Sequence, residues 1–383
     1  MNPVTRKRLA NAAKWIVSTG IGVLFIWLAF RDWPVNSIFQ GGLRLVDGMV
    51  TTDHWRVSLL TLALYFLTLL SLHLFRFWRW QPLLAPLGRV GFWTLNRVCS
   101  VGNMAVFLLP MRLGELVRPM LLSTETPIRR SAAMATIVVE RVVDGVIVAG
   151  FLAVALLFMP SSNAESYLEL KIGTWIAMAV FGAAVLGLVM MFAFRRTLSR
   201  IFHAIASGAG AGGFGRRVAG MLDRFMAGLA VFPDARNFFL FLLMSLLYWG
   251  SNGFGLWVLA HGFQMQTAAG WTPIGIPLIG CFAMMSTIVV GMMIPNAPAN
   301  VGSFWYFLLK PMELYGIAAG NPAGLAYALT VWTLQLLQLI VFGGYFIIRG
   351  QVSFRRAFAI GPSEPEEQVD DINKGGSDAT ATD

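Results

Sequence analysis

Residues 108–122 read LLPMRLGELVRPMLL, and the charges in this stretch decide how the fold is interpreted. Two arginines and one glutamate, Arg112, Glu115 and Arg118, stand in an otherwise apolar run with a proline on either side. A proline removes a backbone donor and disfavours helix at the residue before it, so we expect the helix to break on both sides. Charges in an apolar setting need partners or water, and the surrounding sequence indicates which of these is present.

The composition around this stretch is typical of an integral membrane protein. The chain has 383 residues, of which 57% are hydrophobic and 13% are charged, and its mean hydropathy is +0.67. Soluble domains carry roughly 25% charged residues. The net charge is +10, and the arginines gather at the ends of apolar runs. This placement indicates membrane orientation and contact with anionic lipid headgroups, so we expect no nucleic-acid partner.

Apolar runs recur along most of the chain, and a helix of about 20 apolar residues crosses a bilayer. The candidate spans are residues 15–30, 57–75, 131–159, 172–194, 237–260, 274–294 and 325–348. We therefore predict an all-α fold, a polytopic transmembrane helix bundle of about seven to eight spans. This membrane domain occupies residues 1–350. The first run follows the basic residues RKR, and no A-x-A-like cleavage site comes after it, which favours an uncleaved helix.

The loop charges predict the orientation, because cytoplasmic loops are rich in arginine and lysine. The segments that carry this excess are 1–14, 76–97, 195–236 and the residues after the last helix. Arg76 and Arg79 belong to the second of these segments. The loops at 31–56 and 160–171 are nearly balanced and should face the outside. We therefore expect a protein of the cytoplasmic (inner) membrane with both termini in the cytoplasm.

Two polar segments interrupt or follow the predicted spans. Residues 195–236 read as a cytoplasmic arginine-rich linker, and within it residues 215–232 place their apolar side chains on one helix face. This pattern predicts an amphipathic helix at the membrane surface. Residues 361–383 are acidic and contain no aromatic residue, so we expect 351–383 to form a disordered acidic cytoplasmic tail.

The predicted orientation requires two segments to return to the side from which they enter. Residues 98–122 lie between two cytoplasmic segments, so they form a re-entrant hairpin or two short crossings. Residues 274–324 follow an external loop at 261–273 and must also cross an even number of times. Within them, MMIPNAPANVGSFWYFLL, residues 292–309, shares the outline of the first hairpin. The residues expected to shape the two hairpins are Pro110, Gly114, Pro119, Pro295, Pro298 and Gly302.

The opposite directions of the two hairpins fit an inverted-topology repeat, in which broken helices meet near the middle of the membrane. The alternative is a chance likeness between two proline-broken segments. Irregular backbone is tolerated at membrane depth only inside protein or beside a wet cavity. We therefore expect both hairpins to lie inside the bundle and to line a cavity.

A second charged group lies on the helix that follows the first hairpin. In IVVERVVDGVIVAGFL, residues 137–152, Glu140, Arg141 and Asp144 fall within about 100° of helical arc. Together with the first group they supply three arginines and three acids that could neutralise each other. One interpretation is a buried salt-bridge network that joins the hairpin to this helix. The other is a binding site for a charged headgroup, in which arginines contact phosphate through paired donors.

The remaining polar residues give weaker signals. In the second hairpin, Asn296 and Asn300 indicate either a tight turn or a polar lining for a sugar or phosphate path. The two cysteines and four histidines have no spacing typical of metal ligands. We therefore predict neither a metal site nor a cofactor.

Three motifs together resemble the flippase-like membrane domain named after lysylphosphatidylglycerol synthase, over most of the chain to about residue 350. The pattern P-x-R-x-G-E-x-x-R falls on Pro110, Arg112, Gly114, Glu115 and Arg118, and E-R-x-x-D falls on Glu140, Arg141 and Asp144. The third motif falls on Pro295, Pro298, Ala299, Gly302 and Trp305. Ala299 and Trp305 replace the usual glycine and glutamate, which weighs against an acid-dependent role of the second hairpin. The resemblance implies a polytopic helical domain that moves or handles lipids, including aminoacylated, hopanoid or polyprenyl-linked ones.

These observations support three hypotheses. The first is a translocator of a lipid or lipid-linked intermediate of the cell envelope, with an anionic or lipid-linked membrane lipid as its partner. The second is a membrane-embedded lipid or glycosyl transferase with Glu115, Glu140 or Asp144 as general base, although a nearby arginine should hold each acid ionised. The third is an accessory subunit with envelope-biosynthesis proteins as partners. Because the sequence ends 34 residues after Arg349, we do not expect lysylphosphatidylglycerol synthesis, and we favour the translocator over an enzyme.

Overall fold

The fold was derived from a computed structural model. The structure describes residues 35–160, 164–194, 234–293, 297–317 and 320–352, together with several residues between 16 and 28. The predicted amphipathic helix at 215–232, the tail beyond residue 352, Pro295 and Asn296 lie outside the described residues. The predicted first span lies largely outside them as well.

Five described helices are long and apolar enough to cross a membrane. They are α3 (Leu59–Trp78), which continues into α4 (Trp80–Leu84), α7 (Arg130–Phe158), α8 (Ala164–Ala193), α11 (Ala235–Gly262) and α14 (Pro322–Ile348). Each overlaps a predicted span, although α8 begins at Ala164, within the segment 160–171 that we expected to be a loop. The run predicted at 274–294 forms the shorter α12 (Leu278–Met293). The protein is therefore a mostly helical integral membrane protein.

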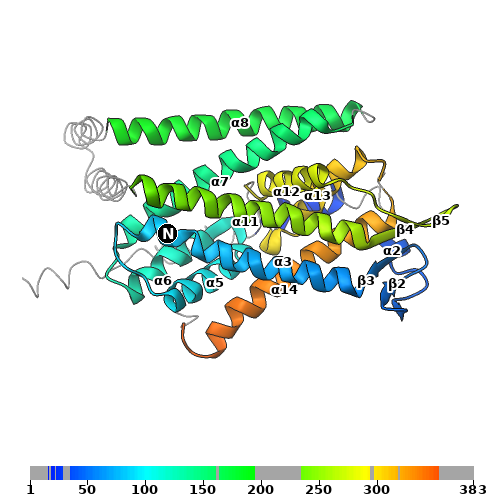
Figure 1. The fold of residues 1–383 in the computed structure, drawn as a ribbon, viewed down its shortest axis with the longest axis horizontal. Helices are drawn as coiled ribbons and strands as arrows, with labels where there is room; N and C mark the ends of the chain where they lie inside the picture. The colour runs from blue at the N-terminus through cyan, green and yellow to red at the C-terminus, as the bar shows by residue number, and fades with distance from the viewer. Residues whose placement is uncertain are drawn as a thin grey trace, which may run out of the picture.

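Shorter elements fill the space between these helices. They are α2 (Val35–Ile38), α5 (Phe92–Leu108), α6 (Val117–Glu125), α13 (Ser303–Glu313) and the 3-10 helices η1 (Pro110–Leu116) and η2 (Pro298–Asn300). Figure 1 shows α3 and α11 in the middle of the molecule and α14 below them, with α5 and α6 towards one end. Helix α8 lies at the outer edge and packs against α7 and α13.

The main core lies where α3, α11, α12 and α14 meet. Tyr65, Leu69 and Leu72 recur at helical spacing on α3 and are buried in this core. The opposite face of the same helix exposes Leu60 and Leu67. In a bilayer such exposed apolar residues face lipid, so the helices bury one stripe against protein and leave the other for the membrane.

The prediction of an all-α fold is wrong at one end of the bundle. Five short strands, β1 (Arg44–Val46), β2 (Met49–Thr51), β3 (Trp55–Ser58), β4 (Phe263–Thr267) and β5 (Gly270–Pro273), form an antiparallel sheet in chain order. Asp47 and Gly48 both have positive φ at the turn between β1 and β2. Asp-Gly favours this tight hairpin turn because both residues tolerate left-handed backbone.

The sheet joins two segments that the loop charges assign to the same side of the membrane. Trp55 of β3 pairs with Met265 of β4, and the Trp55 ring stacks on Phe263 with centroids 5.5 Å apart. The indole nitrogen of Trp55 also donates to the carbonyl of Ile38 at 2.8 Å. The described residues of the predicted loops at 31–56 and 261–273 are thus joined by one sheet at the end of the bundle.

The first proline-broken segment differs from its predicted form. We expected the helix to break at both prolines, Pro110 and Pro119, and α5 does end before Pro110. However, η1 runs from Pro110 to Leu116 and α6 begins at Val117. Pro119 lies in the first turn of α6, where a missing backbone donor costs no helical hydrogen bond. Helix α6 therefore starts next to this proline and is not ended by it.

Gly114 allows η1 to fold back onto α5. A Cβ atom at this position would overlap the backbone of Ala105 and Val106. The close approach brings the charged residues of the segment against the helices of the bundle.

In the second segment, Ala299 and Asn300 of η2 and Gly302, which precedes α13, have positive φ. Pro298 is the first residue of η2, and the carbonyl of Ala299 accepts a hydrogen bond from the indole of Trp332 at 2.9 Å. Segment η2 contacts both η1 and α5. The two broken segments are therefore in contact, whereas their re-entrant path and their relation by an inverted repeat stay predictions.

Candidate functional site

Glu140 and Asp144 on α7 bind a guanidinium group at the end of α3. One terminal nitrogen of Arg79 lies 2.8 Å from Glu140 and 2.9 Å from the second carboxylate oxygen of Asp144. The other terminal nitrogen forms an ion pair with the first carboxylate oxygen of Asp144. The Arg79 side chain is only 2% exposed. This bidentate contact fixes the end of α3 against α7.

The burial of Arg79 corrects the expectation that it is a cytoplasmic loop charge. It is the C-terminal cap of α3, and its guanidinium lies 4.4 Å from the centre of the Tyr248 ring. The available signal was the spacing of Arg76 and Arg79, which are three residues apart at the end of an apolar helix. This spacing places both on one helix face.

Arg118 approaches Glu140 from the first hairpin. Its terminal nitrogen lies 3.1 Å from each carboxylate oxygen, and both side chains are 1% exposed. The guanidinium also lies 5.0 Å from the centre of the Trp80 ring. Gly102 makes room for this side chain, because a Cβ there would overlap it. Glu140 is therefore shared between two fully buried arginines from different helices.

Arg141 connects the buried cluster to a more open region. It lies 3.4 Å from Glu140, 3.5 Å from Asp144 and 3.7 Å from Glu115. Its side chain is 28% exposed and that of Glu115 is 22% exposed. The exposed fraction of the side chains thus decreases from Glu115 and Arg141 to Glu140 and Asp144.

The structure therefore contains a buried Arg/Glu cluster between the first hairpin and α7. Five of the predicted residues belong to it, namely Glu115, Arg118, Glu140, Arg141 and Asp144. The side chain of Arg112 is not among the described ones. In the described part, Arg79 supplies the third arginine, so three cations balance three carboxylates.

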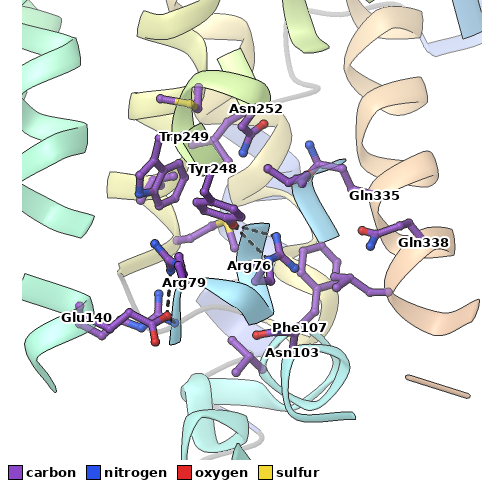
Figure 2. A pocket seen from close by; sticks show the side chains of 18 residues that line it. Arg76, Arg79, Asn103, Phe107, Glu140, Tyr248, Trp249, Asn252, Gln335 and Gln338 are labelled. Carbon is purple, nitrogen blue, oxygen red and sulfur yellow. Dashed lines mark hydrogen bonds and ion pairs between the residues drawn. The ribbon is translucent and has the colours of Figure 1, made fainter. Parts of the chain in front are cut away.

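A cavity of about 120 Å³ opens beside this cluster. Six helices line it, α3, α5, α7, α11, α12 and α14. Its polar and charged lining consists of Arg76, Arg79, Asn103, Glu140, Arg141, Tyr248, Trp249, Asn252, Gln335 and Gln338. Figure 2 shows most of these side chains gathered around Tyr248. Sequence reasoning identified two of them as site residues, Glu140 and Arg141.

Arg76 is the fourth cation of this region. Its Nη2 and Nε donate to the hydroxyl of Tyr248 at 2.9 and 3.2 Å. Among the described residues no carboxylate pairs with it. The Tyr248 ring separates Arg76 from Arg79 (Figure 2) and interacts with both guanidinium groups. With Arg76, the described ionised side chains in and beside the cavity are four arginines and the three carboxylates of the Arg/Glu cluster. They leave one excess positive charge.

Amide side chains make up much of the remaining polar lining. Gln335 donates to the Tyr65 hydroxyl at 3.3 Å. Gln338 is 3% exposed, and its amide nitrogen has no hydrogen-bond partner among the described residues. A buried donor without a partner loses free energy that a bound acceptor can recover. Asn103 and Asn252 line the same cavity from α5 and α11.

The second hairpin contributes less than expected. Asn300 is buried in η2 but is not part of the cavity lining. Trp305 packs against Trp332 with ring centres 5.2 Å apart. The described part of this hairpin thus supports the packing of α13 and α14, and a polar path through it stays a prediction.

The chemistry available here is that of anion binding. Each cluster carboxylate is paired with arginine, whose donors occupy its oxygens. Among the described residues no group of three or more histidine, cysteine or acidic side chains could hold a metal ion. The unbalanced guanidinium of Arg76, by contrast, offers donors that suit a phosphate oxygen.

Comparison with known proteins agrees with the fold and the motifs. No curated protein sequence matches the chain. The family model described as the lysylphosphatidylglycerol synthase TM region matches residues 15–343. This match includes all residues of the Arg/Glu cluster and the described helices up to residue 343, within α14. The chain therefore belongs to the lysylphosphatidylglycerol synthase transmembrane-region family, a family of polytopic membrane proteins.

Proposed function

We propose that the protein binds the phosphate-bearing headgroup of a membrane lipid in the cavity and moves that lipid between the two leaflets. The observation that carries this proposal is the position of Arg76, a cation without a carboxylate partner among the described residues, on the wall of a cavity inside the bundle. The proposed ligand is an anionic membrane lipid or a lipid-linked intermediate.

The charge balance supports a bound anion. An ionised side chain within a bilayer costs about 3 kcal/mol on insertion scales. The cluster of Arg79, Glu140 and Asp144 offsets this cost internally through paired contacts. Arg76 has only the neutral hydroxyl and ring of Tyr248. A phosphate beside Arg76 compensates the excess charge and receives a charge-assisted hydrogen bond.

The arrangement of the lining supports movement of the lipid. The cavity is bounded by helices from both halves of the chain, so a shift of one group against the other changes its opening. The partial exposure of Arg141 provides an entry side for a headgroup while its acyl chains stay in the bilayer. Such a protein handles the polar headgroup and leaves the apolar chains to the membrane.

A transfer assay in reconstituted vesicles tests the proposal. Vesicles contain phosphatidylglycerol with a fluorescent label, and a membrane-impermeant quencher reports the fraction that reaches the outer leaflet. We expect wild-type protein to raise the transfer rate above that of protein-free vesicles. Arg76→Gln removes the excess charge and should lower the rate at least about tenfold, since a hydrogen bond to a charged group contributes about 1.5–3 kcal/mol.

Arg56→Gln is the matched control. Arg56 bonds to Gln264 at 2.7 Å and lies 4.8 Å from the centre of the Trp271 ring, but it belongs to the sheet. It resembles Arg76 in having an uncharged polar partner and an aromatic neighbour. Its replacement should leave the transfer rate unchanged. No transfer by the wild type would contradict the translocation, and equal loss in both variants would contradict the role of Arg76.

A further inference from the structure

His73 is a buried ionisable residue that the proposed function does not use. It belongs to α3, faces α5 and α14, and is 4% exposed. Its Nε2 lies 3.0 Å from the side-chain oxygen of Asn96 and 3.5 Å from the hydroxyl of Ser100. The Ser100 hydroxyl donates to the same Asn96 oxygen at 3.0 Å. Because an amide oxygen only accepts, Nε2 carries the hydrogen and Nδ1 carries the lone pair.

These three polar side chains do not have the geometry of a catalytic triad. In a triad, histidine uses one ring nitrogen for the nucleophile and the other for the orienting group. Here Asn96 and Ser100 both approach Nε2 of His73. The chemical change that this arrangement leaves to the ring is the uptake of a proton at Nδ1.

The surroundings of the ring suit a cation but supply no counter-charge. His73 stacks on Phe342 of α14, with ring centres 3.9 Å apart and 16° between the ring planes. An aromatic face attracts a cation, and an imidazolium donates a stronger hydrogen bond to the oxygen of Asn96 than a neutral imidazole does. Among the described residues no carboxylate contacts His73. A proton bound here therefore adds a positive charge that the described side chains leave unbalanced.

The helices around His73 also line the cavity, each within one turn of the ring. On α3, the lining residue Arg76 is three positions after His73. On α5 and α14, the lining residues Asn103 and Gln338 are one turn away from the residues that contact the ring. Side chains one turn apart on a helix are about 5–6 Å apart at their Cβ atoms. An anion bound at Arg76 thus lies close enough to interact with a charge on His73.

Few other titratable groups lie near the ring. Arg76 is the charged side chain one turn away on α3, and arginine stays protonated at all relevant pH values. From α5 an amide and a hydroxyl face the ring, and from α14 a phenyl group does. The hydroxyl of Tyr248 on α11 contacts Arg76 instead. A pH change near neutrality therefore alters the charge of His73 and leaves these neighbours unchanged.

We infer that His73 is a proton-binding site linked to the anion site at Arg76, so that the protein takes up a proton together with a phosphate-bearing headgroup. A hydronium ion transfers its proton to Nδ1 and leaves as water, and the imidazole becomes an imidazolium. The proton and the bound anion stabilise each other, because linkage between two sites is reciprocal. This inference rests on the proposed function and adds the ion that accompanies the lipid.

Isothermal titration calorimetry of the purified full chain in detergent tests the linkage. The titrant is short-chain phosphatidylglycerol, whose phosphodiester keeps one negative charge, at about pH 5.5 and about pH 8, on either side of the range in which histidine titrates. We expect about tenfold tighter binding at the lower pH, because charges one helical turn apart interact strongly inside a protein. Titrations at the lower pH in two buffers with different heats of ionisation should show uptake of up to about one proton per lipid.

His73→Gln removes the proton site and keeps a polar side chain of similar reach. This variant should bind the lipid with equal affinity at both pH values and take up no proton. The matched control is His261→Gln. His261 is exposed at the end of α11, where its Nδ1 lies 3.1 Å from the carbonyl of Trp257. Its replacement should preserve the pH dependence of the wild type.

Asn96→Asp retains the histidine and so tests the site even if His73→Gln does not fold. A carboxylate at this position lies against Nε2 and favours the imidazolium. The pH at which binding tightens should therefore rise by about one to three units. A histidine that served only in packing would give no such displacement.

Each failure has a separate meaning. If phosphatidylglycerol bound the wild type at neither pH, the proposed function itself would be contradicted. Equal affinity at both pH values without proton uptake, together with loss of binding in Arg76→Gln, would leave the proposed function standing and overturn the linkage. A pH dependence that persists in His73→Gln, or that keeps its midpoint in Asn96→Asp, would overturn the assignment to His73.

Discussion

Arg79 and Glu140 are 61 residues apart in the chain, and their side chains meet at 2.8 Å inside the bundle. This ion pair joins the end of α3 to the middle of α7, and Asp144 and Arg118 complete it on either side. Both residues of the pair line the cavity that Arg76 also lines. Because the other buried arginines are paired with carboxylates, Arg76 is the cation that remains available for a ligand.

Replacement of Glu140 should destabilise the protein strongly. Glu140→Gln leaves Arg79 and Arg118 buried without their shared carboxylate, and loss of one partner of a buried pair costs about 3–5 kcal/mol. Thermal unfolding in detergent, followed by size-exclusion chromatography, measures the effect. The control is Asp53→Asn, which breaks the exposed Arg44–Asp53 pair of 2.5 Å and should cost less than about 1 kcal/mol. Equal unfolding temperatures for the two variants would contradict this assignment.

Gly114 should tolerate no side chain. Gly114→Ala places a methyl group into the backbone of Ala105 and Val106, and such overpacking costs about 1–3 kcal/mol. Gly150→Ala provides the comparison, because a Cβ at Gly150 meets nothing within 4 Å and α7 is helical there. Alanine favours helix over glycine by about 1 kcal/mol. We expect Gly114→Ala to lower the unfolding temperature and Gly150→Ala to raise it. If neither variant lost stability, the close approach of η1 to α5 would be contradicted.

Ala299 carries a strained backbone. Its φ is 57° in η2, and left-handed backbone costs a residue with a Cβ about 1–2 kcal/mol. Ala299→Gly should therefore raise the unfolding temperature in detergent. Ala297→Gly, at φ −60°, should lower it or leave it unchanged, because glycine gains only unfolded-state entropy there. A lower temperature for Ala299→Gly than for the wild type would show that the turn adopts another conformation.

The sheet should face the side opposite the cytoplasm. Cys99 and Cys281 are buried, so a single added cysteine reports its own exposure to a membrane-impermeant maleimide on intact cells. Ala268 is exposed in the turn after β4, so Ala268→Cys should react without permeabilisation. Arg89→Cys lies in the segment predicted to be cytoplasmic and should react only after permeabilisation. Reaction of both in intact cells would contradict the predicted topology.

Local sequence patterns predicted the elements that depend on them. The apolar runs predicted the five long helices, because a span needs only length and low charge. The motifs around Arg118 and Glu140 predicted a buried Arg/Glu cluster, since charges in apolar helices need partners. The sheet was missed although Asp47 and Gly48 carry a strong hairpin signal between apolar residues. Short strands near membrane spans are easily taken for loops.

Other features depend on residues far apart in the chain. Arg76 and Arg79 belong to a basic segment that the charge rule assigns to a loop. Arg79 is buried because its side chain meets Glu140 and Asp144 of α7 and Tyr248 of α11. The cavity combines side chains from six helices, and no local pattern links Asn103 to Gln338. Sequence determined that this chain is a helical membrane protein with charges that must pair. Tertiary structure decided which charges pair and which one is left over, because a buried ion pair depends on distances between helices that the order of residues does not contain.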